Sequence, residues 1–218
     1  MKTEDIHTVI GILREEYKTW RTPAVTIVSQ CEHSPYKVLI SCIISLRTKD
    51  EVTAAASARL FERAGTPAAM TELSASEIGE LIYPAGFYRN KSVQILAISR
   101  QLVSEYGGNV PDKIDDLLKF KGVGRKTANL VVTLGFGKPG ICVDTHVHRI
   151  CNRWGYIKTK TPEESETALR KKLPLEYWIQ INELLVAFGQ NHCHPVSPRC
   201  SSCRLVTFCQ RVGVTVFR

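Results

Sequence analysis

The sequence contains no apolar run that approaches the ~20 residues needed to cross a bilayer. The longest candidate, residues 38–46, is interrupted by Ser41 and Ser45. Residues 1–5 are not followed by the apolar segment of a signal peptide. We therefore expect no membrane partner and a cytoplasmic, nucleoid-associated protein.

Strand-like alternation and low-complexity segments are also missing, whereas helical periodicity runs through most of the chain. One stripe consists of Ile6, Ile10 and Leu13. A second stripe consists of Val38, Leu39, Cys42, Ile43 and Leu46. The pattern predicts an all-α fold.

Several short motifs indicate where helices begin and end. Ser34-Pro35 is typical of a helix start, and three Ser/Thr-x-x-Glu motifs predict capping boxes. These motifs are Thr48-x-x-Glu51, Ser74-x-x-Glu77 and Thr161-x-x-Glu164. Gly107-Gly108 and Gly189 are interpreted as helix-ending glycines. A turn-rich break near residues 135–140 predicts a lobe boundary close to it.

The chain of 218 residues has a formal net charge of +8 and a pI of about 9.1. Basic side chains that neutralise phosphates release condensed counterions, so this balance favours a polyanionic partner. A ribosome-associated protein or a merely basic protein remains an alternative.

Residues 117–129 form the most informative internal segment. Gly122 and Gly124 bracket Val123 between two predicted helices, the first ending at Phe120 and the second continuing through residues 130–132. Paired glycines can expose N–H groups at a helix start, which suits an anion. Because Lys121 and Arg125 flank the turn, a phosphate is the expected occupant. A purely structural hairpin is the alternative.

Lys126 is predicted to lie in the first turn of the second helix. Positive neighbours and the positive end of the helix dipole disfavour an ammonium there. Such a lysine is biased toward a nucleophilic, Schiff-base-forming amine. Simple pairing with a phosphate is equally compatible with these surroundings.

Asp144 is predicted to cap a helix that buries Val147 and Ile150. If its carboxylate also faces Lys126, it can accept a proton and stabilise positive charge on a sugar ring. His146 and His148 diverge on a helix, so DNA contact or packing is favoured over metal binding.

The eight cysteines are distributed unevenly. Cys31, Cys42, Cys142 and Cys151 are scattered among apolar residues, whereas four others share one short segment. Those four are Cys193, Cys200, Cys203 and Cys209. Four thiolates in irregular backbone favour an iron–sulfur cluster. Zinc remains open, although only Cys200 and Cys203 form a C-x2-C knuckle, and disulfides are the least favoured reading.

Together these motifs resemble the endonuclease III family, the bifunctional DNA glycosylase/AP lyases of the helix-hairpin-helix superfamily. The hairpin at residues 121–126, the segment 143–146 and the Cys-x6-Cys-x2-Cys-x5-Cys loop occur in the family's order. The resemblance spans nearly the whole chain.

This resemblance implies a two-lobed helix-hairpin-helix DNA glycosylase fold. Residues 24–137 are expected to form a six-helix barrel lobe with the hairpin. Residues 1–23 and 138–218 are expected to form the iron–sulfur cluster lobe. The implied partner is double-stranded DNA with damaged or abasic sites, bound by a monomer.

The resemblance also implies the roles of individual residues. Lys126 resembles the nucleophile that attacks C1′ of a flipped-out oxidised pyrimidine, with strand cleavage 3′ to the lesion by β-elimination. Asp144 resembles the catalytic aspartate. Cys193, Cys200, Cys203 and Cys209 resemble the ligands of a [4Fe–4S] cluster. The expected DNA contacts are Arg47, Phe87, Lys121, Gly122, Gly124, Arg125 and His146.

Three DNA-contact positions depart from the family pattern. Arg47 stands where bacterial members often carry glutamine, at the residue that fills the gap left by the flipped base. Phe87 replaces an aliphatic wedge, and Lys121 replaces a common proline. An aromatic wedge stacks more strongly, and the lysine adds a charge beside the phosphate.

Two other functions remain to be distinguished from a glycosylase/lyase. One is a monofunctional adenine-type mismatch glycosylase, against which Lys126 argues because such enzymes activate water and lack the lysine. The other is a non-catalytic DNA-binding module with a metal-stabilised loop.

Overall fold

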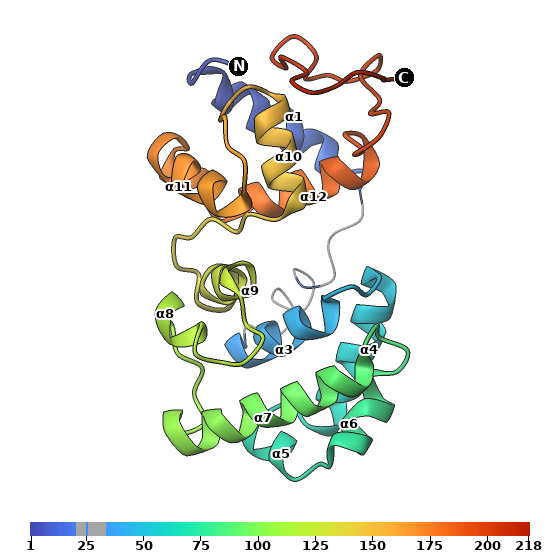
Figure 1. Ribbon diagram of the computed structural model, residues 1–218, viewed down its shortest axis with the longest axis vertical. Coiled ribbons are helices and arrows are strands. Elements are labelled where there is room, and N and C mark those ends of the chain that lie inside the picture. Colours follow the sequence, from blue (N-terminus) through green and yellow to red (C-terminus); the bar gives the residue numbers. More distant parts are fainter. Residues whose placement is uncertain (21–24, 26–33) are drawn as a thin grey trace. The chain divides into compact units, whose positions relative to one another are not determined.

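The computed structural model describes residues 1–20, 25 and 34–218. These residues form helices and no strands (Figure 1), which confirms the all-α prediction. None of the described helices combines the length and the apolar composition of a membrane span. Cys31 lies outside the described residues, as does the predicted boundary between residues 23 and 24.

The chain divides into two compact units. Unit 1 comprises Met1–Pro23 and Ile141–Arg218, and unit 2 comprises Ala24–Gly140. Sequence analysis put the second boundary after residue 137, near the turn-rich segment. The assignment of a six-helix barrel and a cluster lobe stays a prediction.

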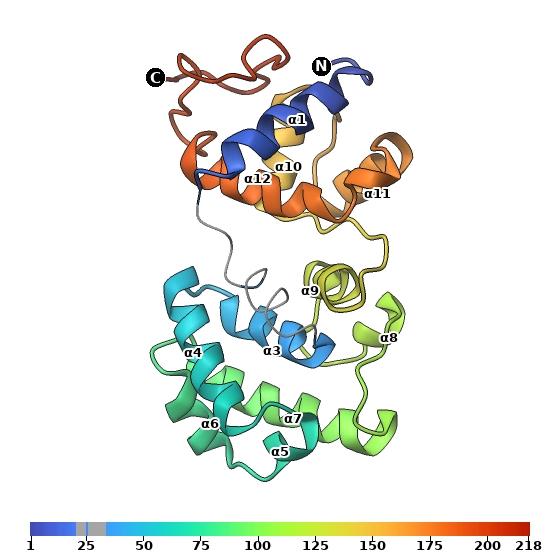
Figure 2. The ribbon, with the colours of Figure 1, turned by 180° about the vertical axis from the view of Figure 1, so that it is seen from behind.

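Unit 2 is built around a buried helix, α3 (Pro35–Ser45), whose residues Tyr36 to Ile44 are buried except Lys37. The other elements of this unit are α4 (Asp50–Arg63), α5 (Pro67–Thr71), α6 (Ala75–Ile82), α7 (Tyr88–Tyr106), α8 (Ile114–Leu117), α9 (Arg125–Leu130) and the π-helical turn η1 (Val131–Gly135). Helix α3 packs against α4, α7, α9 and η1, while α7 packs along α5 and α6 (Figure 2).

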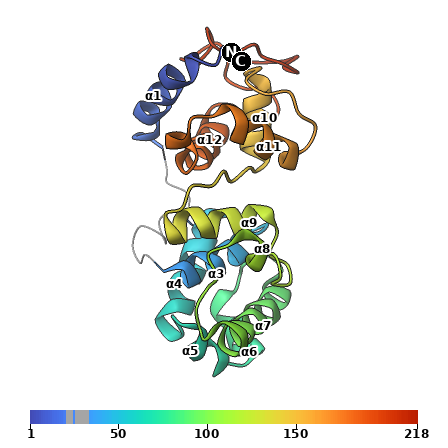
Figure 3. The ribbon, with the colours of Figure 1, turned by 90° about the vertical axis from the view of Figure 1, so that its left-hand side faces the viewer.

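Unit 1 is centred on α12 (Gln180–Asn191), which packs against α1 (Asp5–Tyr17) and α10 (Thr145–Arg153) (Figure 3). Helix α11 (Pro162–Lys172) packs on α10, and a 3-10 turn, η2 (Leu175–Tyr177), precedes α12. The predicted stripe Ile6, Ile10 and Leu13 is buried on α1. Residues 192–218 continue without a further helix.

Three of the predicted helix starts are confirmed. The Ser34 hydroxyl accepts a hydrogen bond from the backbone N–H of Lys37, 3.4 Å away, and Ser74 forms a reciprocal capping box with Glu77. The Thr161 hydroxyl accepts from the N–H of Glu164 at 3.2 Å. The carboxylate of Glu164 accepts from the N–H of Lys160 instead of Thr161, so this capping box is only half formed.

The predicted capping box at Thr48 is wrong. Helix α4 begins after Lys49 and has no side-chain cap. The Thr48 hydroxyl instead accepts hydrogen bonds from the N–H of Gly86 and the amine of Lys91. Leu46, predicted to join the buried stripe of α3, is 40% exposed because the helix ends at Ser45.

Gly107 ends α7 with φ +59°, as predicted. Gly189 was interpreted as another helix-ending residue, but it lies inside α12. A Cβ atom there would stand 2.2 Å from Nδ1 of His146 and 2.8 Å from Nη2 of Arg149. The glycine therefore allows α10 and α12 to approach closely.

We predict that Gly189→Ala lowers the free energy of unfolding by about 1–3 kcal/mol, the usual cost of overpacking. Gly11→Ala in α1 is the matched control, because its Cβ would meet nothing within 4 Å. It should raise the free energy of unfolding by roughly 0.5–1 kcal/mol through helix propensity. Denaturant titration of both variants measures the difference. Equal effects of the two substitutions would contradict the close approach of the helices.

Candidate functional site

The hairpin of unit 2 lies between α8 and α9. Helix α8 ends at Leu117, three residues before the predicted end at Phe120, and Phe120 itself is buried in the turn that follows. Gly122 adopts φ +80°, and a Cβ there would lie 2.4 Å from Nε2 of Gln94. The Gln94 amide donates to the carbonyl of Lys121 at 3.0 Å. Gln94, which sequence analysis missed, therefore fixes the hairpin against α7.

Lys126 lies in the first turn of α9, as predicted, with Gly124 at the N-cap position. Both Arg125 and Lys126 are exposed. Burial raises the pKa of Cys42 on α3 to about 12, and the positive charge of Lys126 acts on that thiol in the opposite direction. Lys126 thus combines an exposed position with a location close to the buried helix of its unit.

Arg47 and Phe87 lie beside each other on unit 2, although 40 positions separate them in the sequence. The guanidinium carbon of Arg47 lies 5.6 Å from the centre of the Phe87 ring, and the ring is 59% exposed. Both residues have a left-handed backbone, with φ +52° and φ +58°. They line a shallow open pocket together with Leu46, Asn90, Lys91 and Gln94.

Gln94 connects this pocket with the hairpin, because it lines the first and bonds to the second. The structure thus brings Arg47 and Phe87 into one region of unit 2 with Lys121 and Gly122.

Lys91 is a further residue that sequence analysis missed. Its side chain is buried at 5% exposure and donates three hydrogen bonds, one to the last turn of α3 and two to the segment that follows it. Burial lowers the pKa of Lys91 to about 8. The available signal was its place on the buried stripe of α7 with Ile95, Ile98 and Leu102.

Asp144 caps α10 in unit 1, as predicted. Its Oδ1 atom accepts hydrogen bonds from the backbone N–H groups of His146 at 2.8 Å and Val147 at 3.0 Å. The residue is 8% exposed, and Val147 and Ile150 are fully buried. The positive end of the helix dipole stabilises a negative charge at this position.

His146 and His148 contact different partners, as expected from their spacing. Nδ1 of His146 lies 3.1 Å from Nη2 of Arg149, beneath Gly189 of α12. Nδ1 of His148 lies 2.7 Å from the hydroxyl of Ser165 on α11. His148 therefore has a packing role, whereas a role of His146 in DNA contact stays a prediction.

Two arginines attach α10 to the cysteine segment. Arg149 donates to the carbonyl of Cys193 at 2.9 Å. Arg153, which is 9% exposed, donates to the carbonyls of His194 and Pro195, both at 2.6 Å, and to the sulfur of Cys193 at 3.4 Å. One helix thus carries Asp144 at its start and holds the cysteine segment at its end.

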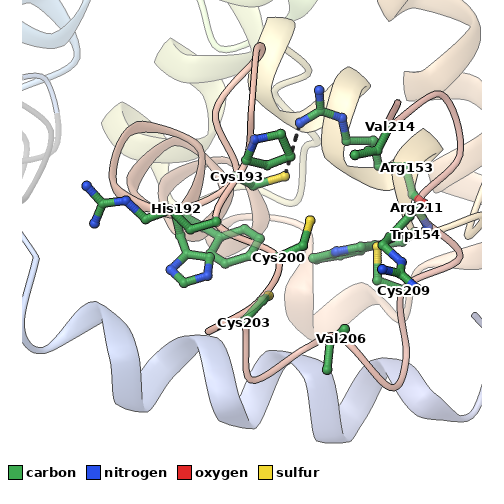
Figure 4. A pocket seen from close by; sticks show the side chains of 13 residues that line it. Arg153, Trp154, His192, Cys193, Cys200, Cys203, Val206, Cys209, Arg211 and Val214 are labelled. Atoms are coloured by element: carbon green, nitrogen blue, oxygen red, sulfur yellow. Dashed lines mark hydrogen bonds between the residues drawn. The ribbon is translucent and has the colours of Figure 1, made fainter. Parts of the chain in front are cut away.

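The four clustered cysteines line one pocket of unit 1 (Figure 4). Their sulfur atoms surround the same space, which is also lined by Trp154, Phe188, Arg153 and Arg211. The N–H of Arg211 donates to the sulfur of Cys209 at 3.4 Å. In the described part of the chain, no three histidine, cysteine or acidic side chains are arranged to hold a single metal ion.

The thiols of this pocket interact electrostatically. Burial, together with smaller contributions from the sulfurs of Cys193 and Cys209, raises the pKa of Cys203 to about 11. Burial and Cys193 also raise the pKa of Cys200. By contrast, Cys42, Cys142 and Cys151 are buried elsewhere and do not line the pocket.

Comparison with known proteins identifies the family. Residues 40–175 match the HhH-GPD superfamily of base excision DNA repair proteins. This match includes the hairpin, Lys126 and Asp144. The fold and the site therefore belong to the HhH-GPD superfamily.

The relatives narrow the class further. Endonuclease III of Thermotoga maritima is 50% identical over 179 residues, which cover 82% of this chain and 84% of the relative. A chloroplastic endonuclease III homologue of Arabidopsis thaliana is 44% identical, and the match covers 80% of this chain and 48% of that longer protein. A solved structure of a trapped endonuclease III–DNA covalent intermediate is 32% identical, with a TM-score of 0.84 and 97% of each chain covered. The chain belongs to the endonuclease III family, the DNA glycosylase/AP lyases of base excision repair.

Proposed function

We propose that this protein removes oxidised pyrimidines from double-stranded DNA and cleaves the strand 3′ to the resulting abasic site by β-elimination. The observation that carries the proposal is the exposed Lys126 in the first turn of α9, directly after the glycine hairpin. Membership of the endonuclease III family supports it, and a trapped covalent complex of a relative with DNA agrees with a nucleophilic amine. An adenine-type mismatch glycosylase would not need this lysine.

The chemistry begins when the target nucleotide is extruded from the helix, because its C1′ atom is unreachable inside the stack. The Lys126 nitrogen forms a bond to C1′, and the glycosidic bond breaks with its electron pair leaving on the base. Loss of protons from nitrogen and opening of the sugar ring then give a Schiff base. Removal of a proton from C2′ expels the 3′ phosphate, which completes β-elimination.

Asp144 is proposed as the carboxylate that accepts a proton during the reaction and stabilises positive charge that develops on the sugar. Its support is the N-cap geometry, in which two backbone N–H groups hold the carboxylate at the start of α10. A carboxylate held in this way needs little reorganisation during the reaction.

DNA contact is assigned to the hairpin and to the Arg47–Phe87 pair. The N–H groups around Gly122 and Gly124 suit a phosphate, with Lys121 and Arg125 adding positive charge. Phe87 and Arg47 suit the space that the extruded nucleotide leaves in the duplex. His146 is also assigned a contact to DNA. The enzyme is proposed to act as a monomer that is associated with the nucleoid.

Cys193, Cys200, Cys203 and Cys209 are proposed to hold a [4Fe–4S] cluster. The chemistry of the pocket fits, because four thiols surround it and both Arg153 and the N–H of Arg211 donate to sulfur. Hydrogen bonds to sulfur and nearby positive charge are common around such clusters. The cluster, when bound, stabilises the segment after α12 and supplies a redox centre.

We predict that borohydride traps a covalent complex between the protein and abasic DNA, and that Lys126→Ala abolishes trapping. The amine is needed for the imine that borohydride reduces. Lys119→Ala is the matched control, because Lys119 is an exposed lysine of the same segment that pairs with Asp116 at 2.7 Å. It should trap like the unmodified protein. If the unmodified protein releases bases but forms no covalent complex, the lyase proposal is wrong.

Two substitutions of Asp144 separate its cap from its charge. Asp144→Ala removes the side-chain acceptor and should lower the free energy of unfolding by roughly 1 kcal/mol. Asp144→Asn retains an acceptor, so it should keep most of the stability. Both variants should release bases at least ~100-fold more slowly in single-turnover assays. Base release by Asp144→Asn at the original rate would reduce Asp144 to a helix cap.

We predict that Cys200→Ser lowers the iron content and the visible absorbance of the purified protein. Cys151→Ala is the control, because Cys151 is buried outside the pocket and should leave both quantities unchanged. Metal analysis should give about four irons per chain, the content of a [4Fe–4S] cluster. A colourless protein with bound zinc would overturn the cluster assignment.

A further inference from the structure

A group of polar atoms joins the segment after α3 to the segment before α7. At its centre lies the buried amine of Lys91, whose three N–H groups each have an acceptor. It donates to the carbonyls of Ile44 at 2.7 Å and Leu46 at 2.6 Å, and to the hydroxyl of Thr48 at 2.9 Å. The acceptors thus lie on both sides of Arg47 in the sequence.

Thr48 connects this segment to Gly86. Its hydroxyl accepts from the N–H of Gly86 at 3.0 Å, as well as from Lys91. A Cβ atom at Gly86 would stand 2.4 Å from the carbonyl oxygen of Arg47, so the two backbones are in direct contact. We call the group formed by Lys91, Thr48 and Gly86 the clasp.

The clasp lies next to two residues with unfavourable backbone conformations. Arg47 precedes Thr48 and has φ +52°, and Phe87 follows Gly86 and has φ +58°. A non-glycine residue in the left-handed region is strained and persists only where its surroundings impose that conformation. The hydrogen bonds of Lys91 and Thr48 lie directly beside both residues.

We propose that Lys91 is a positioning residue for the recognition of duplex DNA: it holds Arg47 and Phe87 together, before DNA binds, in the geometry that fills the gap left by the extruded nucleotide. This inference rests on the proposed function. Lys91 itself is buried and acts through Arg47 and Phe87. Sites held in the productive geometry avoid the cost of ordering side chains on binding.

The experiment measures single-turnover cleavage of an abasic site in duplex and in single-stranded DNA. The single-stranded substrate has no gap in a base stack for Arg47 and Phe87 to fill. Lys91→Met should therefore lower the duplex rate roughly 10-fold or more and the single-stranded rate much less. Thr48→Val should act in the same direction, while Thr48→Ser, which keeps the hydroxyl, should restore the duplex rate.

A double variant tests whether Lys91 acts through Arg47. If it does, the duplex rate lost through Lys91→Met should be smaller in the Arg47→Ala background than in the unmodified protein, because only Phe87 then remains to be positioned. Additive losses would overturn the inference, as would equal losses with duplex and single-stranded DNA. Thr48→Val and Thr48→Ser provide the same comparison if Lys91→Met does not fold.

Lys172→Met is the matched control. Lys172 donates to the carbonyl of Tyr156 at 2.6 Å in unit 1, and it lies outside the clasp. Its removal should leave the ratio of duplex to single-stranded rates as in the unmodified protein. If the unmodified protein fails to cleave abasic DNA, the proposed function itself fails. If the unmodified protein cleaves abasic DNA, and Lys91→Met and Thr48→Val keep its ratio of duplex to single-stranded rates, only the positioning role is wrong.

Discussion

A helix end leaves backbone N–H or C=O groups without partners inside the helix, and in this protein the candidate sites form at such ends. Asp144 accepts from two N–H groups at the start of α10. Lys91 donates to the carbonyls of Ile44 and Leu46 at the end of α3. The hairpin glycines precede the N–H groups that begin α9. Chemistry and recognition are thereby tied to rigid elements.

The need of helix ends for hydrogen-bond partners also explains which features can be predicted from the sequence. Ser74 and Glu77 are three residues apart, so their reciprocal capping box depends only on local geometry, and the motif predicts it correctly. Thr48 has the same motif, but its hydroxyl is bonded to Gly86 and Lys91, 38 and 43 positions away. No local pattern contains these partners. Gly189 was misread for a related reason, since its small size serves a contact with His146 and Arg149 on another helix.

Arg153 shows how unit 1 accommodates a buried charge. A guanidinium removed from water requires several acceptors, and Arg153 finds two carbonyls and one sulfur in residues 193–195. In the proposed cluster, four cysteines on iron would carry negative charge that the neighbouring guanidinium would stabilise. The spacing of the cysteines predicts a shared role for them. The spacing does not indicate that Arg153, which faces the cysteines, lies on α10, the helix that Asp144 caps.

The support of Lys126 is also non-local. Helix α9 has six residues, too few to be stable alone, and it continues into the π-helical turn η1. Two side chains add hydrogen bonds along it: Asn129 donates to the carbonyl of Arg125, and Thr133 donates to that of Asn129. At the far end, a Cβ atom on Gly135 would lie 2.9 Å from Cα of Pro35, so the turn rests directly on the start of α3.

The sequence predicts that Lys126 lies in a helix but does not show which residues stabilise that helix, because π-helical turns are rare and depend on tertiary packing. The buried helix α3 does so, and it also supplies the carbonyls that Lys91 binds. The amine and the Arg47–Phe87 pair therefore share one rigid support within unit 2.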